Sequence, residues 1–128
     1  MAKILIVDDS LFQRRSIRKI LDRRAHEIQE ATNGKEGLEK LQTFQPECII
    51  LDILMPDMDG LGFLKTVRQQ GKTTPIIVLT ADIQETTRRE CLQLGATEIV
   101  YKPLSPLEAD IFLDLLARIL RDAGGQTT

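Results

Sequence analysis

The sequence lacks the features that mark membrane proteins, secreted proteins and cysteine- or histidine-based metal sites. No apolar run approaches the roughly 20 residues that a membrane span requires, and the amino terminus enters an apolar run without a cleavable leader. The two cysteines, Cys48 and Cys91, are too far apart for a CxxC pair, and His26 is the only histidine. We therefore expect a cytoplasmic protein with no membrane insertion, two reduced packed thiols and no catalytic role for His26.

The sequence also lacks a strong charge of either sign. Its formal net charge is −2 at pH 7, which provides no general attraction to nucleic acid. No recognition-helix motif or long basic run is present. Residues 14–24 are rich in arginine and lysine, but we interpret this density as one solvated helix face. The sequence thus predicts no direct nucleic-acid binding.

What is present is a regular alternation of short apolar runs with segments of helical spacing, within the length of one domain. The expected strands are residues 4–7, 26–31, 49–51, 76–79 and 99–101. The expected helices follow Ser10, open at Asn33-Gly34, run from Gly60 to near Gly71, from about Ile83 to Leu94 before Gly95, and from about Pro106 to Arg121. We place the domain at residues 1–122 and interpret residues 123–128 as a short flexible tail.

The character of the runs predicts how the strands are ordered. The runs at 4–7, 49–51 and 76–79 are continuously apolar, as in strands covered on both faces, whereas 26–31 is polar and suits an edge. Right-handed crossovers then favour the order 2-1-3-4-5. The fold class is α/β, a flavodoxin-like doubly wound five-stranded parallel sheet with five helices, and its switch point lies between the first and third strands.

The last helix carries an apolar stripe that we expect to face the core. Its members are Ile111, Phe112, Leu115, Leu116, Ile119 and Leu120. Leu113 falls on a different side, where it is expected to help form a surface for a partner.

Four of the apolar runs are followed by polar residues whose side chains can take part in binding or catalysis. The run at 4–7 is followed by Asp8 and Asp9, that at 48–51 by Asp52, that at 76–79 by Thr80, and that at 99–101 by Lys102. In a parallel sheet these ends share one edge, so the side chains should meet there. Carboxylates suit a hard divalent cation, while a hydroxyl and an ammonium suit phosphoryl oxygens.

The crowding of Asp8, Asp9 and Asp52 would cause strong repulsion without a cation, so we expect a Mg²⁺ site. Beside bound Mg²⁺, Asp52 is a candidate nucleophile that attacks phosphorus and forms an aspartyl phosphate. Thr80 and Lys102 would then stabilise the charge on the phosphoryl oxygens.

With these motifs, residues 3 to 121 resemble the receiver domain of two-component response regulators, of the single-domain chemotaxis-regulator type. The matching motifs are Ile6-Val7-Asp8-Asp9-Ser10, Asn33-Gly34-Lys35-Glu36-Gly37-Leu38, Leu51-Asp52-Ile53-Leu54-Met55-Pro56-Asp57-Met58-Asp59-Gly60, Leu79-Thr80-Ala81, Leu94-Gly95-Ala96 and Lys102-Pro103.

The resemblance implies that Asp52 receives phosphate from a sensor histidine kinase or a phosphotransfer protein. It implies that Asp8, Asp9, Asp52 and the main-chain carbonyl of Leu54 hold Mg²⁺, and that the Lys102–Pro103 bond is cis. It also implies a downstream target protein bound through the fourth helix, fifth strand and fifth helix, in a monomer or weak dimer. Such a protein catalyses only its own phosphorylation and dephosphorylation.

The chain departs from the family in how the signal would be read. Where members often carry an aromatic residue three positions before the lysine, this chain has Ile99, and Tyr101 shares its strand face. Leu54 and Asp82 occupy positions that overhang the phosphoryl group, and only Asp82 could hold a water there. The residues expected to modulate or transmit the switch are Ala81, Asp82, Ile99, Tyr101 and Pro103.

Alternative functions from other classes have less support. A Mg²⁺-dependent phosphohydrolase with an aspartyl nucleophile would carry a second aspartate two residues later, where this chain has Leu54. A phosphorylation-independent interaction module would lack one of the acidic residues. A flavodoxin-type cofactor binder would need a polar anion-binding loop in place of Asp8-Asp9.

Overall fold

The computed structural model describes residues 2–55 and 60–125 and forms one parallel sheet of five strands in the order β2-β1-β3-β4-β5. The elements are β1 Ala2–Val7, α1 Leu11–Leu21, β2 His26–Ala31, α2 Gly34–Phe44, β3 Cys48–Leu51, α3 Gly60–Gln69, β4 Ile76–Thr80, α4 Glu85–Gln93, β5 Glu98–Tyr101 and α5 Pro106–Gly125. The predicted fold class and strand order are confirmed. Residues 56–59 of the matching motif, and 126–128 of the expected tail, lie outside the described residues.

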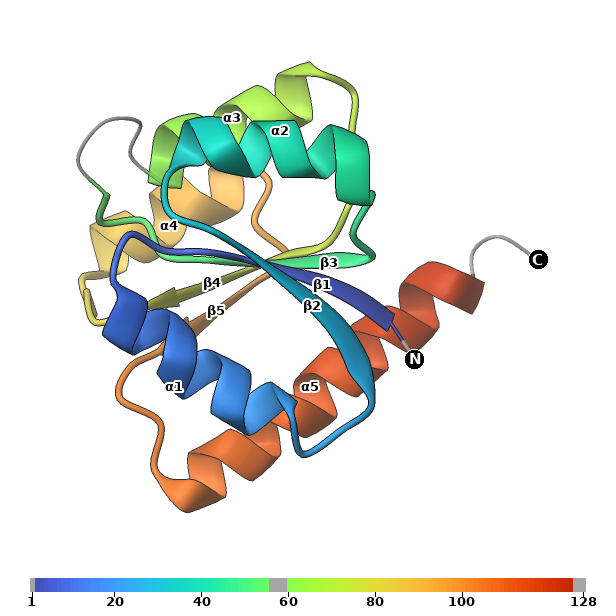
Figure 1. Ribbon diagram of the computed structural model, residues 1–128. Helices are drawn as coiled ribbons and strands as arrows, with labels where there is room; N and C mark the ends of the chain where they lie inside the picture. The colour runs from blue at the N-terminus through green and yellow to red at the C-terminus, as the bar shows by residue number, and fades with distance from the viewer. Residues whose placement is uncertain (1, 56–59, 126–128) are drawn as a thin grey trace.

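Helices cover both faces of the sheet, with α2, α3 and α4 on one side and α1 and α5 on the other (Figure 1). Alternate residues of each strand enter opposite layers, since successive strand side chains point to opposite faces. Leu5 and Val7 of β1 pack in the core under α2 and α3, and Ile4 and Ile6 pack in the core under α1 and α5. Burial on both faces explains why β1, β3 and β4 are almost entirely apolar.

Local signals determine where several helices begin and end. Ser10 caps α1 by accepting a hydrogen bond from the Gln13 amide, and Asn33 caps α2 in the same way, as expected. After α4, Gly95 adopts a φ of +104°, which only glycine tolerates readily. α4 begins at Glu85 rather than Ile83, because the Asp82 carboxylate accepts from the Gln84 amide and holds the preceding residues in a turn.

The orientation of α5 corrects one prediction. Ile111, expected in the core, is 58% exposed, while Leu113, expected on a partner surface, is 3% exposed and packs in the core. Ala109, Phe112, Leu113 and Leu116 are buried in the i, i+3, i+4, i+7 pattern of one helix face, and Ile119 continues that face. The true stripe therefore begins at a small residue. α5 also extends to Gly125, beyond the expected end at Arg121.

The remaining sequence expectations concern isolated residues and the membrane. Cys48 and Cys91 are free and buried, as predicted. His26 opens β2 at the amino edge of the sheet, remote from the carboxyl ends of the strands. Within residues 2–55 and 60–125, no helix combines the length and apolar character needed to cross a membrane.

Candidate metal and phosphoryl site

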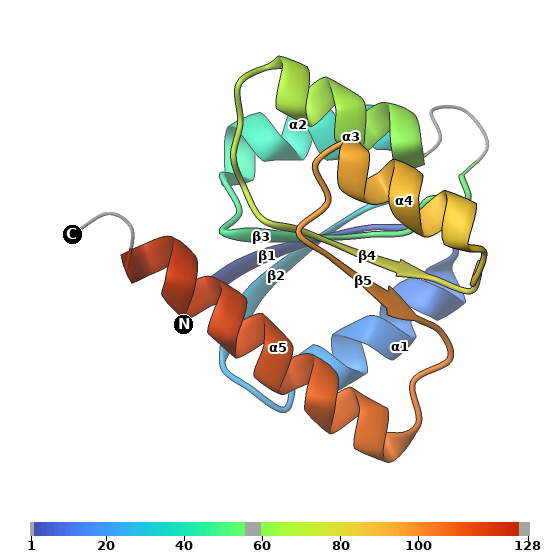
Figure 2. The ribbon, with the colours of Figure 1, turned by 180° about the vertical axis from the view of Figure 1, so that it is seen from behind.

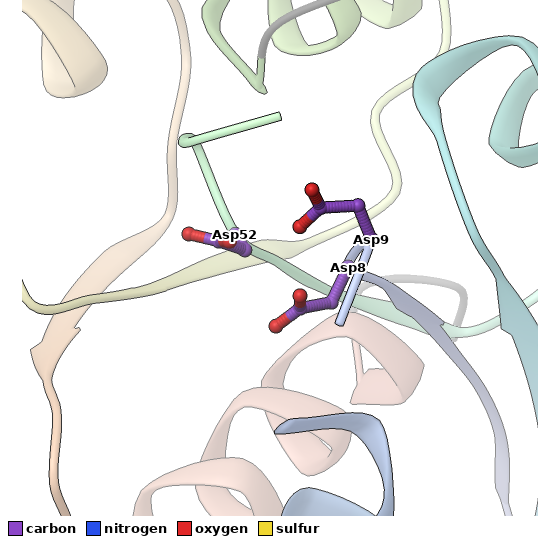
Figure 3. Close-up of side chains that lie close together, drawn as sticks. All are labelled: Asp8, Asp9 and Asp52. Carbon is purple, nitrogen blue, oxygen red and sulfur yellow. The ribbon is translucent and has the colours of Figure 1, made fainter. Parts of the chain in front are cut away.

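Three carboxylates converge at the carboxyl edge of the sheet, at the predicted switch point. Asp8 and Asp9 follow β1 and Asp52 follows β3, its neighbour in the sheet, and one ligand oxygen of each lies within 4.8 Å of the others. Figure 3 shows the three side chains around one gap between the two strand ends. Asp8 and Asp52 are buried, and Asp9 is exposed. The group thus has two buried members and one that faces solvent.

Backbone hydrogen bonds extend the strand ladders past the strand ends and hold these residues in place. The Asp8 amide donates to the Ala31 carbonyl, and the Asp52 amide donates to the Val7 carbonyl at 3.0 Å. Each buried carboxylate also accepts from an amide two residues ahead, Asp8 Oδ1 from Ser10 and Asp52 Oδ1 from Leu54. The carboxylates are therefore preorganised, because both main chain and side chain are constrained.

The electrostatics of Asp52 favour a cation in the gap. Burial raises the pKa of Asp52, and the charges of Asp8 and Asp9 raise it further, while the Leu54 amide and Lys102 oppose the shift. A carboxylate in this setting gains from a nearby positive charge. The donor set fits Mg²⁺, which takes one or two carboxylates and completes its shell with water and phosphate oxygens. Asp8, Asp9 and Asp52 are the side chains that would hold it.

Lys102 and Thr80 complete the predicted group of polar residues at this edge. The Lys102 ammonium lies 3.4 Å from Asp8 Oδ2 and 3.2 Å from Gln13 Oε1. The Thr80 side chain is buried, and its Oγ1 accepts from the Asp82 amide at 3.1 Å. The Lys102 amide donates to the Thr80 carbonyl, and the Lys102–Pro103 bond is cis, as the resemblance implied. All five predicted polar side chains thus lie at the same edge.

Asp82 is held by α4 instead of projecting freely over the site. Its Oδ1 accepts from the Gln84 amide, and its Oδ2 accepts from the Thr87 hydroxyl at 2.7 Å. These hydrogen bonds lower the pKa of Asp82. A role for Asp82 in positioning a hydrolytic water stays a prediction. In the structure, the Asp82 side chain connects the β4–α4 loop to α4.

The residues around the expected switch occupy the face of β5 under α4. Ile99 is 6% exposed in the same core cluster against which Tyr101 packs, so the two share a strand face as predicted. Interaction with the Tyr101 hydroxyl raises the pKa of Arg88 in α4, so these two side chains lie close together. Ala81 and Pro103 are exposed in the adjoining loops, and Leu54 is 61% exposed. Tyr101 therefore links β5 to α4 by a contact that Ile99 cannot make.

Several contacts of α1 were not predicted. The guanidinium of buried Arg14 donates to the Asp8 carbonyl at 2.8 Å and pairs with Glu30 at 2.9 Å, and Arg18 pairs with the other Glu30 oxygen. Gln13 accepts from Lys102. Gln13 lies three residues after the helix cap Ser10, so its position near the site could have been inferred from helical geometry. The Arg14–Glu30 pair has no such local signal.

Comparisons with known proteins agree with this arrangement. Residues 4–120 match the family model described as response regulator receiver domain. The chain is 41% identical over 116 residues to the transcriptional regulatory protein SrrA of Staphylococcus aureus, covering 91% of this chain and 48% of that protein. The chain thus spans about half the length of the curated relatives it matches.

Solved structures give the same result. The chemotaxis protein CheY4 of Vibrio cholerae superposes with a TM-score of 0.84 at 36% identity, covering 93% of this chain and 98% of that one. The signal receiver domain of a putative Luxo repressor protein from Vibrio parahaemolyticus gives 0.90 at 25% identity, covering 98% and 95%. With the fold, the acidic pocket and the family match in agreement, this chain belongs to the response regulator receiver domains of two-component signalling systems.

Proposed function

We propose that the chain is a phosphorylation-dependent switch in which Asp52 accepts a phosphoryl group and the domain then changes which partner it binds. The observation that carries this proposal is the convergence of three carboxylates within 4.8 Å, with Lys102 and Thr80 at the same edge. The family binds Mg²⁺ at an acidic pocket, and the donor set of this chain suits that ion. The phosphodonor would be a sensor histidine kinase or a phosphotransfer protein in the cytoplasm.

The proposed step is a transfer between a phosphohistidine and Asp52. One carboxylate oxygen of Asp52 attacks phosphorus, an O–P bond forms as the N–P bond breaks, and the electron pair of that bond returns to the departing imidazole nitrogen. Bound Mg²⁺ would neutralise charge on the phosphoryl oxygens and orient the group for in-line attack. Lys102 would contribute an ammonium to a second oxygen, and Thr80 a hydroxyl donor to a third.

The conformational change caused by the phosphoryl group would begin at Thr80 and continue into the β4–α4 loop. A Thr80 hydroxyl drawn towards the phosphoryl group changes its bond with the Asp82 amide, and Asp82 is fastened to α4 through Thr87. Tyr101 and Arg88 join α4 to β5 on the same side. We therefore propose the face of α4, β5 and α5 as the surface that a downstream target protein reads, in a monomer or weak dimer.

Two measurements on the full chain test this function. A small phosphodonor such as acetyl phosphate should add one phosphate in the presence of Mg²⁺, and EDTA or Asp52→Asn should prevent the addition. Beryllofluoride, which mimics a phosphoryl group, should change amide hydrogen exchange across residues 80–105. Labelling of Asp52→Asn as well as wild type would contradict the phosphoacceptor role. Exchange altered only near residues 53–55 would contradict the proposed readout.

A further inference from the structure

The position of the Lys102 ammonium supports an inference that rests on the proposed function and concerns how that function is restrained. The lysine side chain is 14% exposed, and its ion pair is with Asp8 at 3.4 Å. Among the described residues, no ion pair joins Lys102 to Asp52, the proposed phosphoacceptor. The hydrogen-bond partners of Lys102 are thus Asp8 and Gln13, and a phosphoryl group on Asp52 would compete with them for the ammonium.

The second partner of Lys102 is a neutral amide from another element. Gln13 Oε1 accepts from the ammonium at 3.2 Å, across 89 positions of sequence. Gln13 is itself constrained, because its main-chain amide donates to the Ser10 hydroxyl in the cap of α1. Its neighbour Arg14 anchors the same turn to the Asp8 carbonyl at 2.8 Å. The main chain that carries the acceptor is thus held in the capped first turn of α1.

The two partners of Lys102 would respond differently to a bound cation. A divalent ion held by Asp8 and Asp9 would draw the Asp8 carboxylate away from Lys102, since the ion carries the larger charge. Gln13 has no negative charge with which to bind the ion strongly, so its bond to Lys102 would persist. We propose that Gln13 is a positioning residue that retains the Lys102 ammonium and so competes for it with a phosphoryl group on Asp52.

This role predicts that loss of the Gln13 acceptor makes the phosphorylated state easier to reach. The net contribution of one hydrogen bond corresponds to a several-fold change in an equilibrium constant. Gln13→Met keeps the side-chain length and helix propensity but removes the acceptor. At saturating Mg²⁺ it should tighten beryllofluoride binding by roughly threefold to tenfold. Gln13→Glu should weaken the binding, because a carboxylate would hold the ammonium more firmly.

A double-mutant cycle distinguishes positioning of Lys102 from a structural effect of the substitution. In a Lys102→Ala background, Gln13→Met should leave beryllofluoride affinity unchanged, since no ammonium remains to be released. In the metal-free protein, Gln13→Met should shift the NMR resonance of the Lys102 ammonium. Gln42→Met, at an exposed position of α2, serves as the matched control and should change neither quantity. Gln13→Ala repeats the test should the methionine variant fail to fold.

The outcomes separate this inference from the proposed function. If the wild type fails to bind beryllofluoride with Mg²⁺, the phosphoacceptor function is wrong. If the wild type binds it but Gln13→Met leaves the affinity unchanged or weakens it, only the role of Gln13 is wrong. Equal tightening in the presence and absence of Lys102 would also overturn that role, because the effect would then not act through the lysine.

Discussion

The two ends of the sheet contain similar polar side chains in opposite electrostatic situations. At the amino edge, side chains satisfy the starts of the strands: Glu47 accepts from the Lys3 amide at 3.1 Å, and Thr97 accepts from the Ile76 amide at 3.0 Å. Arg68 donates to the carbonyls of Gly95 and Thr74. These polar groups at the amino edge therefore have partners of complementary charge or dipole, and their hydrogen bonds stabilise the fold.

At the carboxyl edge, like charges are brought together. Asp8, Asp9 and Asp52 repel one another, and among the described residues Lys102 makes the one ion pair to these three carboxylates, with Asp8. Such an arrangement costs stability in the metal-free protein, which is typical of a site built for a ligand. The contrast teaches that the functional end of a parallel sheet is identified by unbalanced charge.

A sizeable hollow at the amino edge lacks the convergent charge of the carboxyl edge. A hollow of about 830 Å³ lies at the amino edge beside Pro46, Pro75 and the carboxyl-terminal half of α5. Figure 2 shows this part of α5 extending past the start of the sheet. Its acidic lining residues, Glu47 and Asp122, do not belong to the group of carboxylates that could hold a metal among the described residues. Convergent charge, and not volume, locates the chemistry.

The sharpest way to test the comparison uses a glycine from each end. A Cβ at Gly60 would lie 2.1 Å from the Cα of Ile53 and 2.7 Å from the Asp52 carbonyl oxygen, so the backbone must shift. Gly60→Ala should cost about 2–3 kcal/mol of unfolding free energy and slow phosphorylation. Gly71→Ala meets no atom within 4 Å but keeps a φ of +77°. It should cost about 1 kcal/mol and leave phosphorylation unchanged. Denaturant unfolding measures the stability of the two variants, and labelling by a phosphodonor measures their phosphorylation. Equal effects of the two substitutions on phosphorylation would contradict the difference between the two ends of the sheet.

Removal of one charge from the acidic group should weaken metal binding without lowering the stability of the metal-free protein. Asp9→Asn should weaken Mg²⁺ binding by at least about tenfold, the loss seen even for groups that only support metal ligands. The metal-free variant should be as stable as wild type or more stable, because repulsion falls. Calorimetric titration and melting curves measure the two effects. Lower stability with unchanged metal affinity would instead make Asp9 a structural residue of the helix start.

A smaller effect is expected for Asp52 in the metal-free protein. Because burial raises the pKa of Asp52, its ionised form disfavours folding at pH 7, and protonation relieves the cost as the pH falls through that pKa. Asp52→Asn should therefore raise the metal-free stability at pH 7 by about 0.5–1 kcal/mol, and the gain should shrink as the solution is acidified. A gain that grew on acidification would contradict the assigned direction.

The smallest expected effect lies at the amino edge and has the opposite pH dependence. Burial lowers the pKa of His26, whose Nδ1 is buried without a hydrogen-bond partner among the described residues. The neutral imidazole is favoured in the fold, so its contribution is present above the ordinary histidine pKa and lost as the pH falls through the lowered value. As the pH is lowered from 7.5 to about 5.5, the melting temperature should therefore fall less in His26→Gln than in wild type. An equal fall in the melting temperature of both proteins would show that His26 does not contribute to the pH dependence.

Much of the site could be predicted because it depends on rules that act along the chain. The carboxyl ends of parallel strands meet at one edge, so the strand boundaries alone bring Asp8, Asp52, Thr80 and Lys102 together. The caps Ser10 and Asn33 are equally local. The face of α5 was misjudged because the buried stripe begins at Ala109, a residue too small to stand out in an apolar pattern.

The contacts that were missed depend on tertiary packing. Arg14 meets Glu30 because α1 lies against β2, and neither residue carries a local signal of the other. The bond from Lys102 to Gln13 joins the end of β5 to the first turn of α1. The predicted switch residues Ile99 and Tyr101 could be assigned to one face from strand periodicity, but the Arg88 partner of Tyr101 could not.

The central claim is that the carboxylate of Asp52 is the acceptor of the phosphoryl group, and chemical trapping tests it most directly. Wild-type protein is incubated with Mg²⁺ and acetyl phosphate, and the acyl phosphate is reduced with borohydride, which converts a phosphorylated aspartate to homoserine. Peptide sequencing by mass spectrometry should then find homoserine at position 52 and aspartate at positions 8 and 9. Homoserine at either of those positions, or none at position 52 in protein that carries phosphate, would contradict the account.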